Sequence, residues 1–237
     1  MLDILGGITL VAGTIVTWGL LIRAGTPIPA VRRRIATRVA LWFAAVALLG
    51  ALGVFAAARF GTPIMGVAVV LPVVAGVVIA RRSHALHPYL FAMPLALLIA
   101  VNVGRLLGVF FLILQSVGRL PSTFAHSAGY GDIAVAILAI PVALAAYRKV
   151  AGWQAIVMAW NVLGFADLIT AVTLGVGSSN SPLRFMTELP ASTAIATLPW
   201  VLIPAFFVPT FLLIHLVIFV RLRRSWAVSP APRPARA

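Results

Sequence analysis

The chain has 237 residues, of which 62% are hydrophobic and only 9% are charged, and its mean hydropathy is +1.12. A soluble domain cannot bury that much apolar surface, so the composition predicts a polytopic membrane protein. The net charge of +14 does not indicate nucleic-acid binding, because the arginines stand in short segments between apolar runs. The absence of cysteine excludes disulfides, thiol catalysis and cysteine-ligated metals.

Seven apolar segments are each long enough to cross about 30 Å of hydrocarbon. In chain order they are 4–22, 37–58, 63–80, 89–114, 124–147, 152–176 and 198–220. We therefore predict an all-α transmembrane bundle of seven helices that forms one domain over residues 1–225. Asp3, and the lack of a basic segment before the first apolar run, favour a span over a cleaved signal peptide. Residues 226–237 are basic and Pro-rich, and we expect them to be a disordered cytoplasmic tail.

The basic residues predict the orientation of the bundle. Fourteen fall in loops on one side, against three on the other, which are Arg59, Arg119 and Arg184. Because basic loops stay in the cytoplasm, we predict an outside N-terminus and a cytoplasmic C-terminus in a bacterial inner membrane. The basic face should contact anionic lipids.

Glycine and proline residues mark where the helices deviate from regular packing. Gly104 and Gly108 form a G-x-x-x-G step that allows a neighbouring backbone to approach closely. Pro199, Pro204 and Pro209 predict bends in the seventh span. Residues 124–132 are rich in glycine and small polar residues, so they are either helical or partly re-entrant.

Three charged residues fall inside predicted spans, at one depth. At about 1.5 Å per residue from the cytoplasmic ends, Arg105 lies about 24 Å up the fourth span, and Asp132 and Asp167 lie about 22 Å up the fifth and sixth. This level is in the outer half of the membrane. A charge in mid-bilayer costs between ~2.5 and ~15 kcal/mol, so these three residues are expected to meet inside the bundle.

Polar neighbours extend this predicted cluster. Asn102 is one turn from Arg105, Asn161 lies below Asp167, and Thr170 lies one turn above it. We predict that they line a cavity with Arg105, Asp132 and Asp167. Three roles stay open: a structural ion-pair lock, a site for a ligand, ion or proton, and a contact for a membrane-protein partner or a second copy.

Gly129, Tyr130, Gly131 and Asp132 match the G-x-G-D pattern of intramembrane aspartyl proteases. In those families the G-x-G-D aspartate follows the other catalytic aspartate, whereas here Asp167 comes second. Arg105 at the same depth would also hold both carboxylates ionised. A protease is therefore a remote alternative, and we do not expect an enzyme.

The four histidines do not predict a cofactor or metal site. His126 lies near the outer end of the fifth span and His215 in the cytoplasmic half of the seventh, too far apart to bracket one haem. His84 and His87 stand in a loop without a carboxylate or thiolate nearby, which favours a solvated loop. The only lysine, Lys149, is in a loop, which excludes a retinal Schiff base in the last span.

The run from Gly118-Arg119-Leu120-Pro121 through Phe124-Ala125 to Gly131-Asp132 resembles a group of uncharacterised bacterial multi-pass membrane proteins. The resemblance covers about a third of the chain, from the fourth span to the sixth, together with Asn161 and Asp167. It implies the position of the site but no activity.

The sequence thus predicts a membrane protein that binds or transports a small solute, a lipid headgroup or a proton. The alternative is a non-catalytic membrane subunit or an assembly factor of a larger complex.

Overall fold

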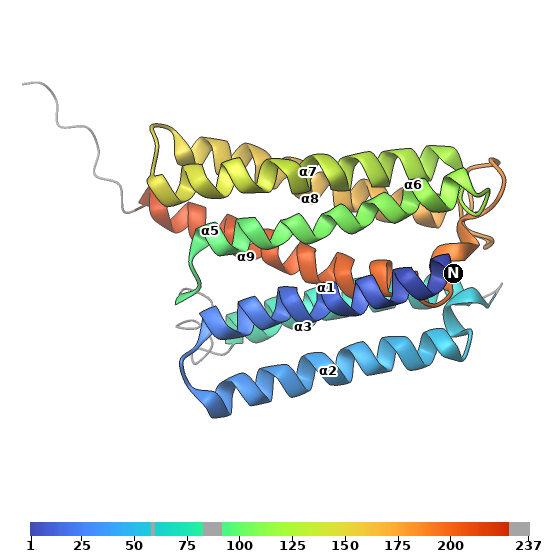
Figure 1. Ribbon diagram of the computed structural model, residues 1–237, viewed down its shortest axis with the longest axis horizontal. Helices are drawn as coiled ribbons and strands as arrows, with labels where there is room; N and C mark the ends of the chain where they lie inside the picture. Colours follow the sequence, from blue (N-terminus) through green and yellow to red (C-terminus); the bar gives the residue numbers. More distant parts are fainter. Residues whose placement is uncertain (58–59, 83–91, 228–237) are drawn as a thin grey trace, which may run out of the picture.

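The computed structural model of the protein describes residues 1–57, 60–82 and 92–227, and within those ranges its regular elements are all helices (Figure 1). The histidines at positions 84 and 87 lie outside the described ranges. The predicted disordered tail, residues 226–237, begins with two helical residues, and from residue 228 onward it lies outside the described ranges.

Among the described residues, seven helices are long and apolar enough to cross a membrane, which confirms the predicted number of spans. Five are continuous: α1 (Leu2–Gly25), α2 (Pro29–Ala51), α3 (Gly61–Arg82), α7 (Ser122–Arg148) and α8 (Trp153–Gly177). The fourth span joins α5 (Leu95–Ala100), the 3-10 helix η3 (Val101–Gly108) and α6 (Val109–Ser116). The seventh joins a π-helical turn, η5 (Ile203–Phe207), to α9 (Val208–Ala227). Two short 3-10 helices, η1 (Val54–Ala56) and η4 (Ser192–Ala196), lie in connections.

Residues 124–132 are helical, so the re-entrant alternative is wrong. They belong to the 27-residue helix α7, which continues through the glycines of this stretch. Glycine costs a helix about 1 kcal/mol relative to alanine, and tertiary packing outweighs that cost. Asp132 therefore lies on a continuous helix that can hold its carboxylate at a fixed position.

The fourth span begins later than the sequence predicted. Pro94 has an extended backbone (ψ 131°) and precedes the first helical residue, Leu95. Met93 precedes this proline and is not helical. A residue before proline is disfavoured in the helical region, which explains the boundary here. Arg105 is consequently the eleventh residue of the 22 from Leu95 to Ser116, in the middle of its span. Its placement in the outer half of the membrane stays a prediction.

The seventh span also begins later than predicted, and this shift moves His215. Pro204 lies within the π-helical turn η5, where a missing N–H is tolerated because the α-helical ladder is already interrupted. The long apolar helix runs over Ile203–Ser225, and His215 is its thirteenth residue out of 23. The sequence placed His215 in the cytoplasmic half, whereas it lies in mid-span at the level of Arg105.

The helix α9 and its π-helical turn form the axis of the bundle. Within an 18-residue apolar stretch of this span, 67% of the residues are buried, against 6% in α3 and 11% in α2. The fourth span, α7 and α8 pack together along one side of this axis, while α1 and α3 lie on the other side (Figure 1). Helix α2 lies at the edge of the bundle beside α1. The outer faces of the helices are apolar, as contact with lipid requires.

The basic residues gather at one end of the bundle. The connections from α1 to α2 and from α7 to α8 lie there, as does the end of α9 (Figure 1). This basic end carries Arg23, Arg32, Arg33, Arg34, Arg81, Arg82, Arg148, Lys149, Arg221, Arg223 and Arg224. The opposite end, called the N-terminal end below, carries Met1, Arg119 and Arg184 among the described residues.

Candidate functional site

The 3-10 helix η3 presents Arg105 to the interior. A 3-10 helix has three residues per turn, so Asn102, Arg105 and Gly108 line up on one face, and all three are buried. Runs of 3-10 helix longer than about four residues are uncommon, and η3 has eight. The Arg105 side chain is 1% exposed, which makes it one of the largest enclosed side chains in the described chain.

Arg105 donates hydrogen bonds to three different helices. Its Nε bonds Asp132 Oδ1 on α7 at 2.6 Å, and its Nη2 bonds Asp167 Oδ2 on α8. Its Nη1 bonds the Gly164 carbonyl of α8 at 2.9 Å and contacts His215 Nε2 of α9 at 3.3 Å. The guanidinium thus ties the fourth span to the fifth, sixth and seventh.

Glycines allow the two carboxylates to reach this position. A Cβ added to Gly108 would lie 2.4 Å from the Cβ of Asp132, and one added to Gly131 would lie 1.7 Å from Asp167 Oδ1. Both distances are far below van der Waals contact. The predicted close approach at Gly108 is therefore present, and Gly131 provides a second one between α7 and α8.

His215 belongs to the same network, which the sequence analysis missed. A guanidinium has no acceptor, so His215 Nε2 must accept the bond from Arg105. The proton of the ring then lies on Nδ1 and is donated to Asn161 Oδ1 at 2.7 Å, while Asn161 Nδ2 donates to the His215 carbonyl at 3.1 Å. His215 is thus a neutral histidine with a fixed tautomer. The sequence analysis missed it because it did not place His215 at the level of Arg105.

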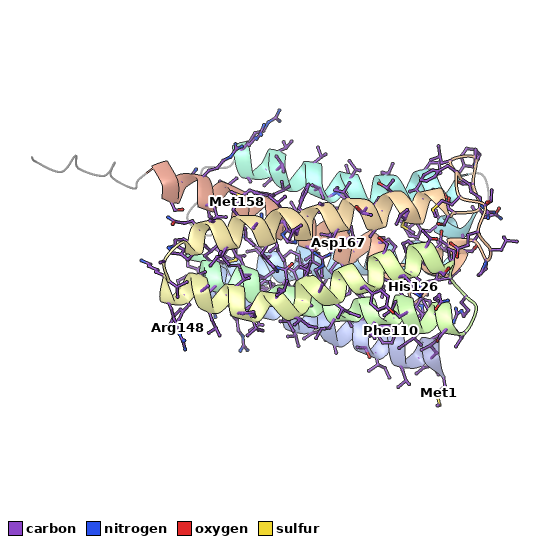
Figure 2. All side chains as sticks on the ribbon, turned by 90° about the horizontal axis from the view of Figure 1, so that it is seen from above. Met1, Phe110, His126, Arg148, Met158 and Asp167 are labelled. Atoms are coloured by element: carbon purple, nitrogen blue, oxygen red, sulfur yellow. The ribbon has the colours of Figure 1, made fainter. Side chains whose placement is uncertain are left out.

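Of the predicted site residues, the structure brings Arg105, Asp132 and Asp167 into direct contact and joins Asn161 through His215. These four with His215 are called the Arg105 centre below. Figure 2 shows Asp167 between the ends of the molecule that carry Met1 and Arg148.

The structure places Asn102 and Thr170 apart from the Arg105 centre. Asn102 Nδ2 donates to the carbonyls of Leu98 and Ile99 at 3.0 and 3.3 Å, and its buried Oδ1 has no partner among the described residues. Thr170 is exposed and donates to the Ala166 carbonyl at 3.0 Å. A threonine hydroxyl often bonds the carbonyl four residues earlier, and this bond directs it away from the carboxylates.

The Arg105 centre has a surplus of negative charge and little free volume. Two carboxylates face one guanidinium and one neutral imidazole, so the centre carries one net negative charge when both carboxylates are ionised. The cavity beside Arg105 and Asp132 has a volume of about 20 Å³ and is otherwise walled by apolar residues such as Leu107, Phe207 and Phe211. It has room for about one water molecule.

The chain belongs to the family described as "Domain of unknown function (DUF8737)", which matches residues 59–223. The match contains every residue of the Arg105 centre and leaves out α1 and α2. Membership agrees with the predicted resemblance to an uncharacterised family. No curated protein and no solved structure matches the chain.

Proposed function

We propose that this protein is a proton-binding, permease-like component of a bacterial inner membrane, and that Asp167 is the residue that binds and releases the proton. The observation that carries the proposal is the imbalance of charge at the Arg105 centre. One guanidinium compensates one carboxylate, and an uncompensated charge in mid-membrane is costly. A single proton on one carboxylate removes that cost.

The small volume of the cavity beside Arg105 and Asp132 favours a proton as the ligand over the larger ligands that the sequence analysis also allowed. A space of about 20 Å³ holds one water molecule but neither a small solute nor a lipid headgroup. Among the described residues there is no group of three or more histidine, aspartate or glutamate side chains that could hold a metal ion. A proton needs only a carboxylate and a water molecule to deliver it.

Asp167 is the better proton acceptor of the two carboxylates because it is the more accessible. Its side chain is 16% exposed, against 11% for Asp132. Gly131, whose missing side chain makes room for the Asp167 carboxylate, is partly exposed, so this carboxylate lies near the surface between α7 and α8. Asp132 instead lies against Gly108 inside the bundle, where it lines the enclosed cavity.

Protonation of Asp167 would weaken a bond that holds α8 to the fourth span. A neutral carboxyl group attracts the Arg105 guanidinium less strongly than a carboxylate does. Arg105 would keep its bonds to Asp132, His215 and the Gly164 carbonyl, so the change would be confined to one contact between helices. A proton-coupled transporter needs a contact between helices that changes with protonation, and this contact is one. The irregular segments η3 and η5 are where the backbone can change conformation in response.

The proposed orientation follows from the basic residues. The basic end of the bundle would face the cytoplasm and contact anionic lipids, which places the C-terminus inside and the N-terminus outside. A reporter fused after Ala237 should then be active only in the cytoplasm, and one inserted after Ser181 only outside.

Proton uptake by Asp167→Asn tests the proposal. Purified protein in detergent is titrated from about pH 8 to about pH 5, and the protons taken up per molecule are counted with an indicator dye. The wild type should take up about one proton more than Asp167→Asn, which retains every histidine. Thr170→Val, a control on the same helix, should match the wild type. Equal uptake by the wild type and Asp167→Asn would overturn the proposal.

A second candidate function is a structural lock in a subunit or assembly factor of a membrane complex. The four hydrogen bonds of Arg105 to three helices favour it, because they fix the packing without any ligand. In that case Asp167→Asn lowers the unfolding temperature and leaves proton uptake unchanged. Size-exclusion chromatography of mildly extracted protein would then show a fixed partner or a homo-oligomer.

A further inference from the structure

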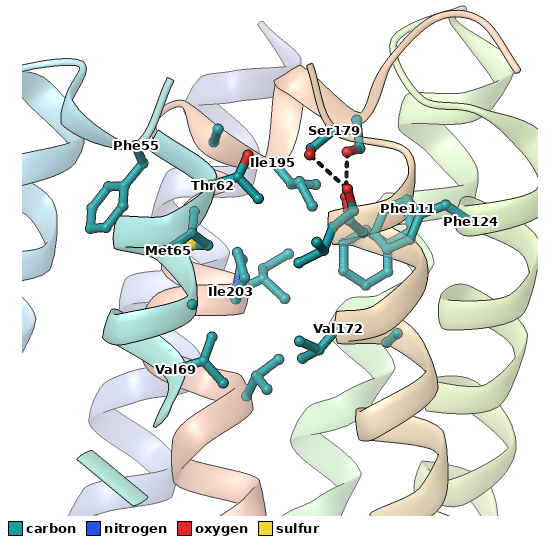
Figure 3. Close-up of a pocket in the computed structure, with 18 residues that line it drawn as sticks. Phe55, Thr62, Met65, Val69, Phe111, Phe124, Val172, Ser179, Ile195 and Ile203 are labelled. Atoms are coloured by element: carbon teal, nitrogen blue, oxygen red, sulfur yellow. Dashed lines mark hydrogen bonds between the residues drawn. The ribbon is translucent and has the colours of Figure 1, made fainter. Parts of the chain in front are cut away.

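A second pocket lies between α3 and α8, toward the N-terminal end of the bundle (Figure 3). Its volume is about 70 Å³, more than three times that of the cavity at Arg105. Met65 and Val69 of α3 line one wall, and Val172 of α8 lines the opposite wall. Ile203 of η5 lines the floor between them. No acidic residue of the Arg105 centre lines the pocket.

The lining of the pocket selects an apolar occupant. Its aromatic and aliphatic side chains include Phe111 and Phe124, and its few polar groups are hydroxyls near the N-terminal end. Two of these hydroxyls are already bonded within the protein: Ser179 Oγ donates to the Val176 carbonyl at 2.6 Å, and Ser192 Oγ donates to the Gly175 carbonyl at 2.8 Å. A polar solute would therefore lose its hydration and gain few partners.

The surroundings of the pocket are hydrocarbon. Within an 18-residue stretch of α3 only 6% of the residues are buried, and the side chains of Val67 and Val70 are 58% and 57% exposed. Ile169 on α8 is 46% exposed. Both walls therefore continue into faces that contact lipid, and an unfilled apolar space beside them would forfeit dispersion contacts. The molecules at hand to fill it are the lipids of the bilayer.

We propose that this pocket binds one hydrocarbon chain of a membrane lipid, which enters between α3 and α8. From Thr62 to Val69 the pocket follows α3 for seven residues, or about 10 Å, so it accommodates a segment of chain and not a whole lipid. The hydroxyls at its N-terminal end lie where the polar part of the lipid would emerge. The chain runs inward from there along the floor formed by η5.

The lipid pocket shares a wall with the cavity at Arg105. Ile203 and Val208 line both spaces, on the two sides of the π-helical turn. A chain on the floor of the pocket thus rests on the irregular segment that closes the cavity. The lipid proposal stands independently of proton binding, since it depends on shape and apolarity alone.

Gly66 provides a substitution that fills the pocket without a clash. It lines the pocket, and a Cβ added there meets no atom within 4 Å. Gly66→Phe should therefore project its ring into the space that the chain occupies, while replacing a helical glycine favours the helix. Gly19→Phe is the matched control, because Gly19 also lies in a spanning helix and also has nothing within 4 Å, but does not line the pocket.

The experiment uses vesicles of phosphatidylethanolamine and phosphatidylglycerol that carry a diazirine in the acyl chain. After illumination, peptide mass spectrometry measures adducts at Met65 and Val172, with adducts on the exposed face of α2 as the reference. The wild type and Gly19→Phe should give equal pocket labelling, and Gly66→Phe should give about tenfold less. Gly66→Leu is the second variant if Gly66→Phe does not fold. Pocket labelling that stays at the wild-type level in a folded Gly66 variant, or that never exceeds the α2 reference, would overturn the proposal.

Discussion

The hairpin of α1 and α2 and the remaining five spans are all apolar enough to cross a membrane, yet they play different parts in the structure. Over an 18-residue stretch, the mean hydropathies of α1 and α2 are 1.9 and 1.5, and those of the five other spans lie between 1.8 and 2.5. However, no residue of α1 or α2 belongs to the Arg105 centre, whereas the fourth span, α7, α8 and α9 each contribute to it. The family match begins at residue 59 and leaves out the same two helices.

This difference teaches that hydropathy identifies a span without showing how it packs. Lipid tails are as apolar as leucine, so apolar side chains alone give helices little reason to associate. Polar groups and glycines do give a reason, because a buried charge needs partners and a glycine permits close approach. In this protein Arg105, Asp132, Asp167 and Gly131 all lie in the five-span part.

Loss of the Arg105 guanidinium should cause the largest loss of stability, because it lies in the five-span part. Arg105→Ala leaves two carboxylates facing each other without a cation, which should destabilise the protein by ~3–5 kcal/mol in detergent. Combining it with Asp132→Asn should recover part of the loss, because one negative charge is removed. Thermal unfolding measures both variants. Arg38→Ala, at an exposed position of α2, is the control and should be nearly neutral.

The close approach of α7 to α8 at Gly131 should be the next most sensitive to substitution. Gly131→Ala adds a methyl group whose carbon would lie 1.7 Å from Asp167 Oδ1. Helices α7 and α8 must therefore separate, or the carboxylate must move. We expect a loss of ~1–3 kcal/mol in unfolding experiments. Gly19→Ala in α1 meets nothing within 4 Å and should not destabilise. If both variants behaved alike, the close approach of Gly131 to Asp167 would not contribute to the stability of the five-span part.

A smaller and pH-dependent effect is expected at the N-terminal end of α7. Glu188 accepts hydrogen bonds from Ser122 N at 2.8 Å, from Ser122 Oγ and from Thr123 N at 3.0 Å, in place of a cap that Pro121 cannot supply. These bonds from Ser122 and Thr123 lower the pKa of Glu188 from 4.5 to about 2. A lowered carboxyl pKa stabilises the fold above the unfolded value of 4.5, and this contribution is lost as the pH falls through 2.

Glu188→Gln should therefore lower the unfolding temperature by about 2–4 °C at neutral pH. The difference from the wild type should shrink as the pH falls from 4.5 through 2, because Glu188 takes up its proton first in the unfolded chain and then in the folded one. Calorimetry at a series of pH values measures it. A difference that is independent of pH would mean that the carboxylate charge does not stabilise α7.

The number of spans and the meeting of Arg105 with two aspartates were predictable, because the bilayer imposes a length on each helix and a cost on each charge. The position of His215 was not predictable, since it depends on where the prolines allow the seventh span to begin. Two irregular segments, η3 and η5, left no periodic signal in the sequence. The lipid pocket depends on how α3 and α8 pack against α9, which no local pattern encodes.

The smallest effect is expected on α2, where Leu41 is 65% exposed and faces lipid. In Leu41→Ala, lipid tails fill the volume of the lost methyl groups. No cavity remains, and the helix surface stays in contact with hydrocarbon. The unfolding temperature in nanodiscs should match that of the wild type. Leu98→Ala makes the same chemical change in α5, where the side chain is 1% exposed, and should cost ~2–5 kcal/mol because a cavity remains. An equal loss in both variants would show that α2 packs against protein, as a partner or a second copy, on the face that the isolated chain leaves to lipid.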